Sequence, residues 1–124
     1  KYGIMEAVCK GVHQSDHYHW GLTVGILPDG DRSNANAYVD IVIPTAMQFA
    51  RNQAVVLSGE TVIATAGGTG TLSELALAWQ YGKKIIAVSR FDGWSKELGG
   101  KVLDKKYDKP VLKAENVEEV IWQL

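Results

Sequence analysis

The sequence predicts an α/β domain built on a mostly parallel sheet. Short apolar runs typical of buried strands alternate along the chain with segments whose apolar residues recur at helical spacing. Residues 61–81 join such a run, a glycine-rich turn and an amphipathic helix. The length of 124 residues, with 46% hydrophobic residues, suits a single compact domain covering residues 1–124.

The elements are expected in a regular order. A near-continuous apolar run ending at Pro28 is typical of a strand buried on both faces. Thr45 and Gln48 have the spacing of a capping box, which predicts a helix beginning there. The expected strands are residues 22–27, 39–43, 61–65, 84–89 and 110–112, and the expected helices are residues 3–13, 45–58, 70–81, 94–98 and 116–124. An α/β domain normally begins with a strand, so the strand that should precede the first helix is expected to be absent from the given chain.

The polar segment 14–20 carries residue types that bind zinc or nickel, namely His17, His19 and Asp16, close to His13. No further ligands recur at ligand spacing, so an exposed loop is the favoured interpretation and no metal site is predicted. The loop 29–37 follows a strand, where α/β proteins place ligand contacts. A solvated connector remains at least as good an explanation for this loop.

Composition excludes several classes of function. A formal net charge of -1 and the lack of any Lys/Arg run predict no nucleic-acid partner. The single cysteine, Cys9, rules out an internal disulfide. No apolar run approaches the roughly 18 residues of a membrane span, so no membrane partner is expected and a cytoplasmic setting is the default.

The glycine-rich turn predicts a phosphate site. A strand that turns into a helix through glycines leaves the first helical N–H groups facing an approaching anion at the positive end of the helix dipole. The turn lacks the Lys-Ser/Thr pair of a P-loop. It also lacks the third glycine of a dinucleotide loop, and the next strand does not end in an acidic residue. What remains is a phosphate cradle without either signature.

Two charged residues near this turn have two interpretations each. Glu74 can reach back over the turn and act on a bound sugar as a general base or charge stabiliser, since helical side chains lean toward the N-terminus. Equally, Thr71 and Glu74 have the spacing of a capping box. Arg51 suits a phosphate or carboxylate, although position alone favours a surface or ion-pair role.

The pattern GGTGTLSELALAWQYGKKIIAV resembles the GGxGTxxE signature of the LOG (Lonely Guy) superfamily, once labelled lysine decarboxylase-like. The stretch GIMEA near the start is similar to the family's first glycine loop entering its helix, and FARN occupies the place of its arginine-bearing helix. LTVGILP, YVDIVIPT and FDGWSKEL resemble the branch that includes molybdenum cofactor carrier proteins and uncharacterised Rossmann-like proteins.

The resemblance implies a Rossmann-like three-layer sandwich, a homodimer or higher homo-oligomer, and a small phosphorylated ligand, AMP-like or a pterin. In LOG enzymes the activity is hydrolysis of the N-glycosidic bond of nucleoside 5′-monophosphates, with no cofactor required. The family's catalytic arginine and glutamate match Arg51 and Glu74. The residues that match its ligand- and phosphate-binding positions are Gly3, Gly67, Gly68, Thr69, Gly70 and Thr71.

This chain departs from the LOG enzymes at two positions. Ala66 replaces the proline before the double glycine, and Asn52 stands where a lysine is usual. The carrier branch is similar in these respects, and there the implied function is binding of molybdenum cofactor without turnover. The resemblance to the LOG enzymes makes hydrolysis the leading expectation, and the departures leave a non-catalytic carrier or a ligand sensor as the alternative.

Overall fold

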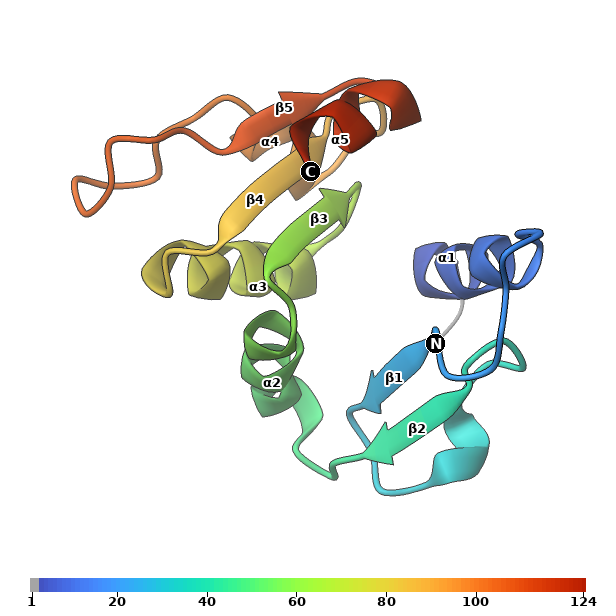
Figure 1. Ribbon diagram of the computed structural model, residues 1–124. Helices are drawn as coiled ribbons and strands as arrows, with labels where there is room; N and C mark the ends of the chain where they lie inside the picture. Colours follow the sequence, from blue (N-terminus) through green and yellow to red (C-terminus); the bar gives the residue numbers. More distant parts are fainter. Residues whose placement is uncertain (1–2) are drawn as a thin grey trace. The chain divides into compact units, whose positions relative to one another are not determined.

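The computed structural model describes residues 3–124, and the chain divides into two compact units, Lys1–Arg51 and Asn52–Leu124 (Figure 1). The first unit holds a two-stranded sheet and the second a three-stranded sheet. Every strand pair in both sheets is parallel, and helices alternate with strands along the chain. The predicted α/β class with a mostly parallel, Rossmann-like arrangement is therefore confirmed.

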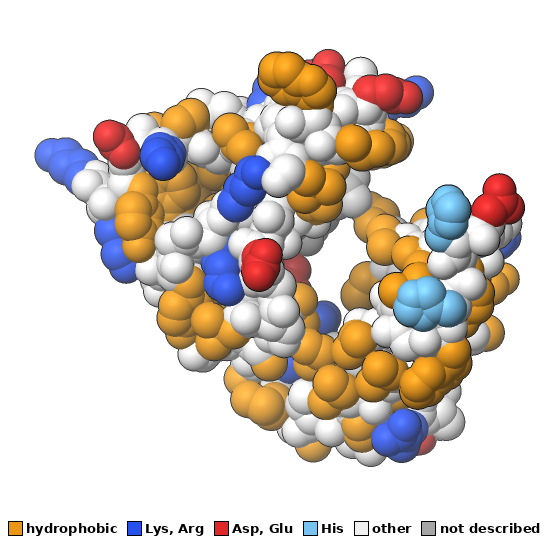
Figure 2. Space-filling model, viewed as in Figure 1, with side chains coloured by type: hydrophobic (Ala, Val, Ile, Leu, Met, Phe, Trp, Pro, Cys, Tyr) orange, Lys and Arg blue, Asp and Glu red, His pale blue; other side chains and the backbone are white. Residues whose placement is uncertain are grey.

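The described part of the first unit, residues 3–51, forms one helix, two strands and two 3₁₀ turns. These elements are α1 (Ile4–His13), β1 (Val24–Leu27), η1 (Arg32–Asn34), β2 (Ile41–Pro44) and η2 (Gln48–Ala50). The expectation that the first strand is buried on both faces is wrong, since Val24 is 54% exposed and only Leu27 of this strand is buried. β1 has β2 as its neighbour in a sheet of two strands, so little of its surface is covered. Figure 2 shows hydrophobic side chains at the surface of this unit.

The helix expected from residue 45 begins six residues later. α2 runs over Arg51–Ser58 and is preceded by η2. The hydroxyl of Thr45 donates to the Leu27 carbonyl and accepts from the Met47 amide, instead of capping a helix with Gln48. Ala46 and Gln48 have positive φ angles of 55° and 49°, which a continuous helix does not allow. The capping-box prediction at Thr45 is therefore wrong.

The second unit matches the predicted order more closely. It contains α2, β3 (Thr61–Thr65), α3 (Thr69–Gln80), β4 (Lys84–Val88), α4 (Trp94–Leu98), β5 (Leu112–Ala114) and α5 (Val117–Gln123). The sheet order is β3-β4-β5. The last strand begins two residues later than predicted, because Val111 exchanges backbone hydrogen bonds with Gly100 and Lys101 rather than with β4. Asn116 caps α5 as predicted, its side chain accepting from the Glu119 amide at 2.9 Å.

The core of the second unit lies between its sheet and α3. Leu75 and Ala78 of α3 are fully buried in one cluster with Ile85 and Ala87 of β4. Of the face predicted for this helix, Leu75 and Trp79 are buried but Ala76 is exposed. Ile86, whose side chain points to the opposite face of β4, is also fully buried. In Figure 1, α5 lies on the face of the sheet away from α3, so helices cover both faces of this sheet.

A buried carboxylate holds the first unit together around Asp40, whose side chain is 3% exposed. It accepts hydrogen bonds from the Tyr18 hydroxyl at 2.7 Å and from the Gly21 and Thr23 amides at 3.1 Å. Burial raises its pKa, but these hydrogen bonds outweigh that effect and lower the pKa to about 2. The hydrogen bond to Asp40 raises the pKa of Tyr18. The His13 ring stacks on Tyr18 with its Nε2 3.2 Å from Asp40.

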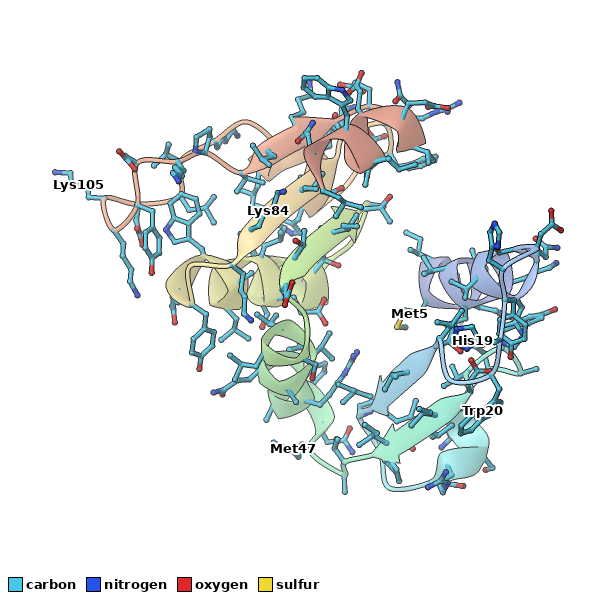
Figure 3. All side chains as sticks on the ribbon, viewed as in Figure 1. Met5, His19, Trp20, Met47, Lys84 and Lys105 are labelled. Carbon is cyan, nitrogen blue, oxygen red and sulfur yellow. The ribbon has the colours of Figure 1, made fainter. Side chains whose placement is uncertain are left out.

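Within residues 3–124, no helix is long and apolar enough to cross a membrane. Among the same residues, no three side chains of the His, Cys, Asp and Glu types are grouped as a metal site would need. Of the histidine-rich segment singled out in the sequence, His13 is engaged with Asp40, and Figure 3 shows His19 and Trp20 in the segment that leads from α1 to β1.

Candidate functional site

The candidate site is the loop between β3 and α3, which we call the glycine loop (residues 66–71). It leaves the carboxyl end of β3, the edge at which open parallel sheets bind ligands. Ala66 and Gly67 both have positive φ angles, 51° and 93°. Gly68 is the N-cap of α3, and the first amide of the helix ladder is that of Leu72, which donates to the Gly68 carbonyl. The amides of residues 69–71 therefore have no acceptor within the helix.

This geometry tests the capping-box interpretation of Thr71 and Glu74. The N-cap is Gly68, no side chain caps the helix, and Thr71 lies inside its first turn. The alternative that Thr71 and Glu74 form a capping box is therefore wrong. Thr71 instead packs on the loop, because a Cβ added to Gly67 would fall within the Thr71 side chain. Only glycine fits at position 67, for its φ as well as for this contact.

The outer side of the loop is open. A Cβ added to Gly68 or to Gly70 would meet no atom within 4 Å. The residues from Gly68 to Gly70 are exposed. The loop therefore presents backbone to a region where a ligand of the size of a phosphate has room.

The start of α4 fixes the inner side of the loop. The amides of Trp94 and Ser95 donate to the carbonyls of Gly67 and Ala66, at 3.0 and 3.1 Å. A Cβ added to Gly93 would lie 2.6 Å from the Ala66 carbonyl carbon and 2.8 Å from the Gly67 nitrogen. Gly93 thus allows two backbones to touch.

These two hydrogen bonds also orient the amides of the loop. In a trans peptide the C=O and the following N–H point in opposite directions, and the described part of the chain contains no cis peptide bond. Because the carbonyls of Ala66 and Gly67 face α4, the N–H groups of Gly67 and Gly68 face away from it. The loop amides and the first amides of α3 can then donate hydrogen bonds to one bound anion.

Sequence reasoning missed Gly93 and Ser95 as parts of this site. Ser95 is fully buried and its hydroxyl donates to the Val88 carbonyl at 2.9 Å, which fixes α4 to the end of β4. The sequence signals were a glycine in a turn shortly after an apolar strand and the stretch FDGWSKEL, which resembles the carrier branch but assigned no role to either residue.

Ala66 explains one departure from the LOG enzymes. Its φ of 51° is forbidden to proline, whose ring holds φ near −65°. A loop of this shape therefore cannot carry the proline that the LOG pattern has before its double glycine. The burial of residue 52 accounts for the other departure. Asn52 is 4% exposed and its side-chain amide lies 3.4 Å from the Ser73 hydroxyl. A lysine at this position would have its charged side chain enclosed by protein and not in solvent.

The remaining predicted site residues are divided between the two units. Glu74 is half-buried in α3, next to the fully buried Leu75. Gly3 is the exposed N-cap of α1, with φ 73°, and Arg51 is the half-buried first residue of α2. Gly3 and Arg51 belong to the first unit, and the glycine loop with Glu74 belongs to the second.

Arg90 and Phe91, which follow β4, lie at the same edge of the sheet as the glycine loop. Thr65 and Val88 are register partners at the ends of β3 and β4, so the segments that follow them leave the sheet side by side. Arg90 and Phe91 are exposed there, with the guanidinium carbon 5.9 Å from the ring centroid. A cation and an aromatic face beside the glycine loop are suited to a planar, anionic ligand.

The fold and this site define a class: a Rossmann-like α/β protein whose glycine loop lacks both the P-loop lysine and the dinucleotide signature. Within this class the chain belongs to the SLOG cluster4 family, which it matches over residues 1–121. This confirms the resemblance to the LOG-like superfamily. A protein of Archaeoglobus fulgidus described as uncharacterized is 40% identical over 86 residues, which are 69% of this chain and 54% of that protein. The chain thus spans about half the length of this relative.

Two solved structures are similar over nearly the whole chain. The X-ray structure of TM1055 has a TM-score of 0.82 and 29% identity, covering 98% of this chain and 72% of that one. The molybdenum cofactor binding protein from the phototrophic bacterium Rippkaea orientalis has a TM-score of 0.77 and 36% identity, covering 97% of this chain and 68% of that one.

Proposed function

We propose that this protein binds a phosphorylated pterin of the molybdenum cofactor type without turning it over, and that the glycine loop holds the phosphate. The observation that carries the proposal is the loop itself, whose inner carbonyls are bonded to α4 and whose outer glycines face open space. The 36% identity to a molybdenum cofactor binding protein over 97% of this chain supports the choice of ligand.

The residues present fit the phosphate of such a cofactor. Gly67, Gly68, Thr69, Gly70 and Thr71 supply backbone amides at the positive end of α3. Phe91 offers an exposed aromatic face and Arg90 a cation at the same edge of the sheet. When bound, the cofactor would supply redox chemistry to a partner enzyme, and this chain would orient and protect it.

The experiment is purification from cells that make the cofactor, followed by pterin fluorescence and molybdenum analysis. The test variant is Gly70→Asp, because a Cβ there meets no atom within 4 Å and the added carboxylate in the first turn of α3 would repel the phosphate of the proposed ligand. An acidic residue in the first turn of a helix stabilises it by roughly 0.5 kcal/mol, so lost binding cannot be confused with lost folding. We expect pterin with the wild type and none with this variant.

The control is Gly11→Asp, which adds the same charge at another exposed and unhindered glycine. It should retain pterin at the wild-type level. Absence of pterin and molybdenum from wild-type protein made in cofactor-replete cells would refute the proposal, and so would equal binding by the two variants.

Hydrolysis of nucleoside 5′-monophosphates is the second candidate function. The observation that favours it is the position of Glu74 in α3, about one turn beyond the glycine loop and the Gly68 N-cap. In this proposal Glu74 acts as base or charge stabiliser and Arg51 positions the phosphoribosyl group. AMP is incubated with the protein and the products are separated by chromatography. Free adenine that disappears with Glu74→Gln would support this function, and no adenine above the buffer control would exclude it. In this second proposal the ligand is AMP-like. The homodimer implied by the family resemblance is likewise a proposal.

A further inference from the structure

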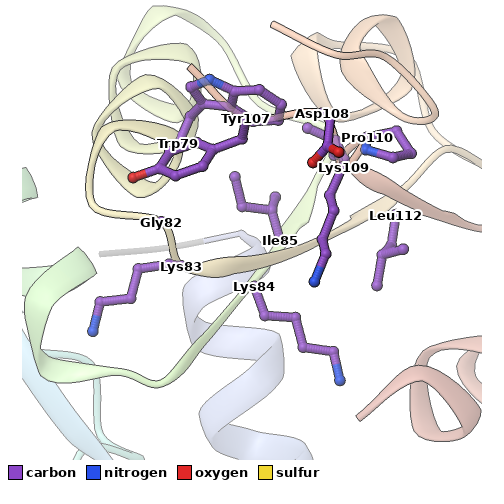
Figure 4. Close-up of a pocket in the computed structure, with 11 residues that line it drawn as sticks. Trp79, Gly82, Lys83, Lys84, Ile85, Tyr107, Asp108, Lys109, Pro110 and Leu112 are labelled. Atoms are coloured by element: carbon purple, nitrogen blue, oxygen red, sulfur yellow. The ribbon is translucent and has the colours of Figure 1, made fainter. Parts of the chain in front are cut away.

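A cavity lies at the edge of the second unit's sheet that is opposite to the glycine loop. Its volume is about 540 Å³, within the range of small-molecule sites in proteins. It is bordered by the end of α3, the first residues of β4 and the loop that leads into β5 (Figure 4). These are amino-terminal strand ends, so the cavity is separate from the site proposed above.

One wall of this cavity is a firmly held loop, residues 101–109. The Trp79 indole donates to the Asp104 carboxylate at 2.8 Å, and the Lys106 ammonium donates to the Gln80 carbonyl at 2.7 Å. Tyr107 packs edge-on against Trp79, with ring centroids 5.8 Å apart. The loop is thus fixed to the carboxyl end of α3, where a lysine also offsets the negative end of the helix dipole.

The charge of the lining favours an anion. Three lysines line the cavity, Lys83, Lys84 and Lys109, against one carboxylate, Asp108. The ammonium groups of Lys83 and Lys84 donate to the carbonyls of Gly59 and Leu124. Among residues 3–124, the Lys109 ammonium has neither a hydrogen bond nor an ion pair. In Figure 4 it extends between Ile85 and Leu112 toward Lys84.

The rest of the lining is apolar or aromatic. Ile85, Pro110 and Leu112 border the space crossed by Lys109, and the Trp79–Tyr107 ring pair closes one side. Gly82 allows this closure, because a Cβ there would lie 3.1 Å from the Tyr107 hydroxyl. An unpaired cation over an apolar floor recognises a ligand with an anionic group on a planar hydrophobic body.

We propose that this cavity is a second ligand site, specific for small aromatic anions, with Lys109 as the residue that pairs with the anionic group. The site does not depend on the phosphorylated pterin or on the glycine loop. Its position on the far edge of the sheet leaves both sites accessible at once.

The test is a titration of the whole protein with 1-naphthyl phosphate, followed by two-dimensional NMR of backbone amides and tryptophan indoles. Trp79 is the reporter, and Trp20 and Trp122 are internal references. We expect saturable shifts at the Trp79 indole and at Gly82. Affinity should fall about tenfold or more in Lys109→Glu, as a charge-assisted hydrogen bond is replaced by repulsion. Inorganic phosphate and neutral 1-naphthol should each bind more weakly than the combined probe.

The control is Lys105→Glu, which changes the same charge on the same loop outside the cavity lining. Figure 3 shows Lys105 on the outer part of the loop, away from Lys84. This variant should bind as the wild type does. The amides of Gly67 and Gly68 are followed in the same spectra, because the glycine loop can also take the phosphate of the probe. Shifts confined to the glycine loop, or equal affinity in the two variants, would overturn the proposal.

Discussion

Replacing Gly93 by alanine tests whether α4 shapes the glycine loop. Gly93 has φ 131° and ψ −172°, a region that is essentially open to glycine alone. An alanine there pays about 1–3 kcal/mol for its backbone conformation. Its Cβ would also lie 2.6–2.8 Å from backbone atoms of Ala66 and Gly67, and relieving such overpacking costs about 1–3 kcal/mol more. We expect Gly93→Ala to lower the free energy of unfolding by about 3 kcal/mol.

The matched control is Gly100→Ala. Gly100 also has a positive φ, 81°, but a Cβ there would meet nothing within 4 Å. It should lose only the conformational part, about 1 kcal/mol. Urea unfolding followed by circular dichroism measures both losses.

The second measurement is phosphate binding at the loop, taken from the shifts of the Gly68 and Gly70 amides as inorganic phosphate is added. Gly93→Ala must push the loop outward and break the hydrogen bonds from Trp94 and Ser95, so its phosphate affinity should fall about tenfold, the equivalent of one lost hydrogen bond. Gly100→Ala should bind phosphate normally. Equal loss of stability in the two variants, or unchanged phosphate binding in Gly93→Ala, would refute the role given to α4.

Three further substitutions have defined outcomes. Ala66→Pro should lower the free energy of unfolding by about 3 kcal/mol, because proline cannot adopt a φ of 51°. In the same urea assay Ala66→Gly should be neutral or stabilising. A tolerated proline would mean that the loop has another shape. Asp40→Asn should be less stable than the wild type at neutral pH, and the gap should narrow between pH 4 and pH 2. The reason is that the pKa of Asp40 is lowered from 3.8 to about 2 in the folded protein. The Asp40 carboxylate therefore contributes fully to the free energy of unfolding above pH 3.8, and this contribution is lost as the pH falls through 2. A stability difference between the two proteins that stays constant in acid unfolding would contradict this. Asn116→Ala should lower stability by about 1 kcal/mol through loss of the α5 cap, with Asn116→Asp restoring most of it in thermal denaturation.

Local patterns in the sequence predicted the elements of the second unit well. β3 and α4 have the predicted bounds, α3 begins one residue before the predicted start, and β4 ends one residue before the predicted end, at Val88. Their apolar spacing and glycine turns are properties of adjacent residues, which is why the sequence suffices. The capping-box patterns at Thr45 and Thr71 misled for the same reason: a capping box is a spacing of side chains, and it forms only where the backbone at the first residue is extended. At Thr45 a carbonyl of β1 competes for the hydroxyl, and at Thr71 the helix has already begun.

The sequence by itself determined the α/β class and the strand–glycine loop–helix unit, because each depends on neighbours along the chain, and it also named the loop residues that are proposed to bind a phosphate. Only the tertiary structure decided how the loop is held: α4 follows β4, yet its first amides bind the carbonyls of a loop that follows β3. That contact joins segments more than twenty residues apart, and no spacing rule encodes it. The role of Gly93, the positive φ of Ala66 and the direction of the loop amides all follow from it.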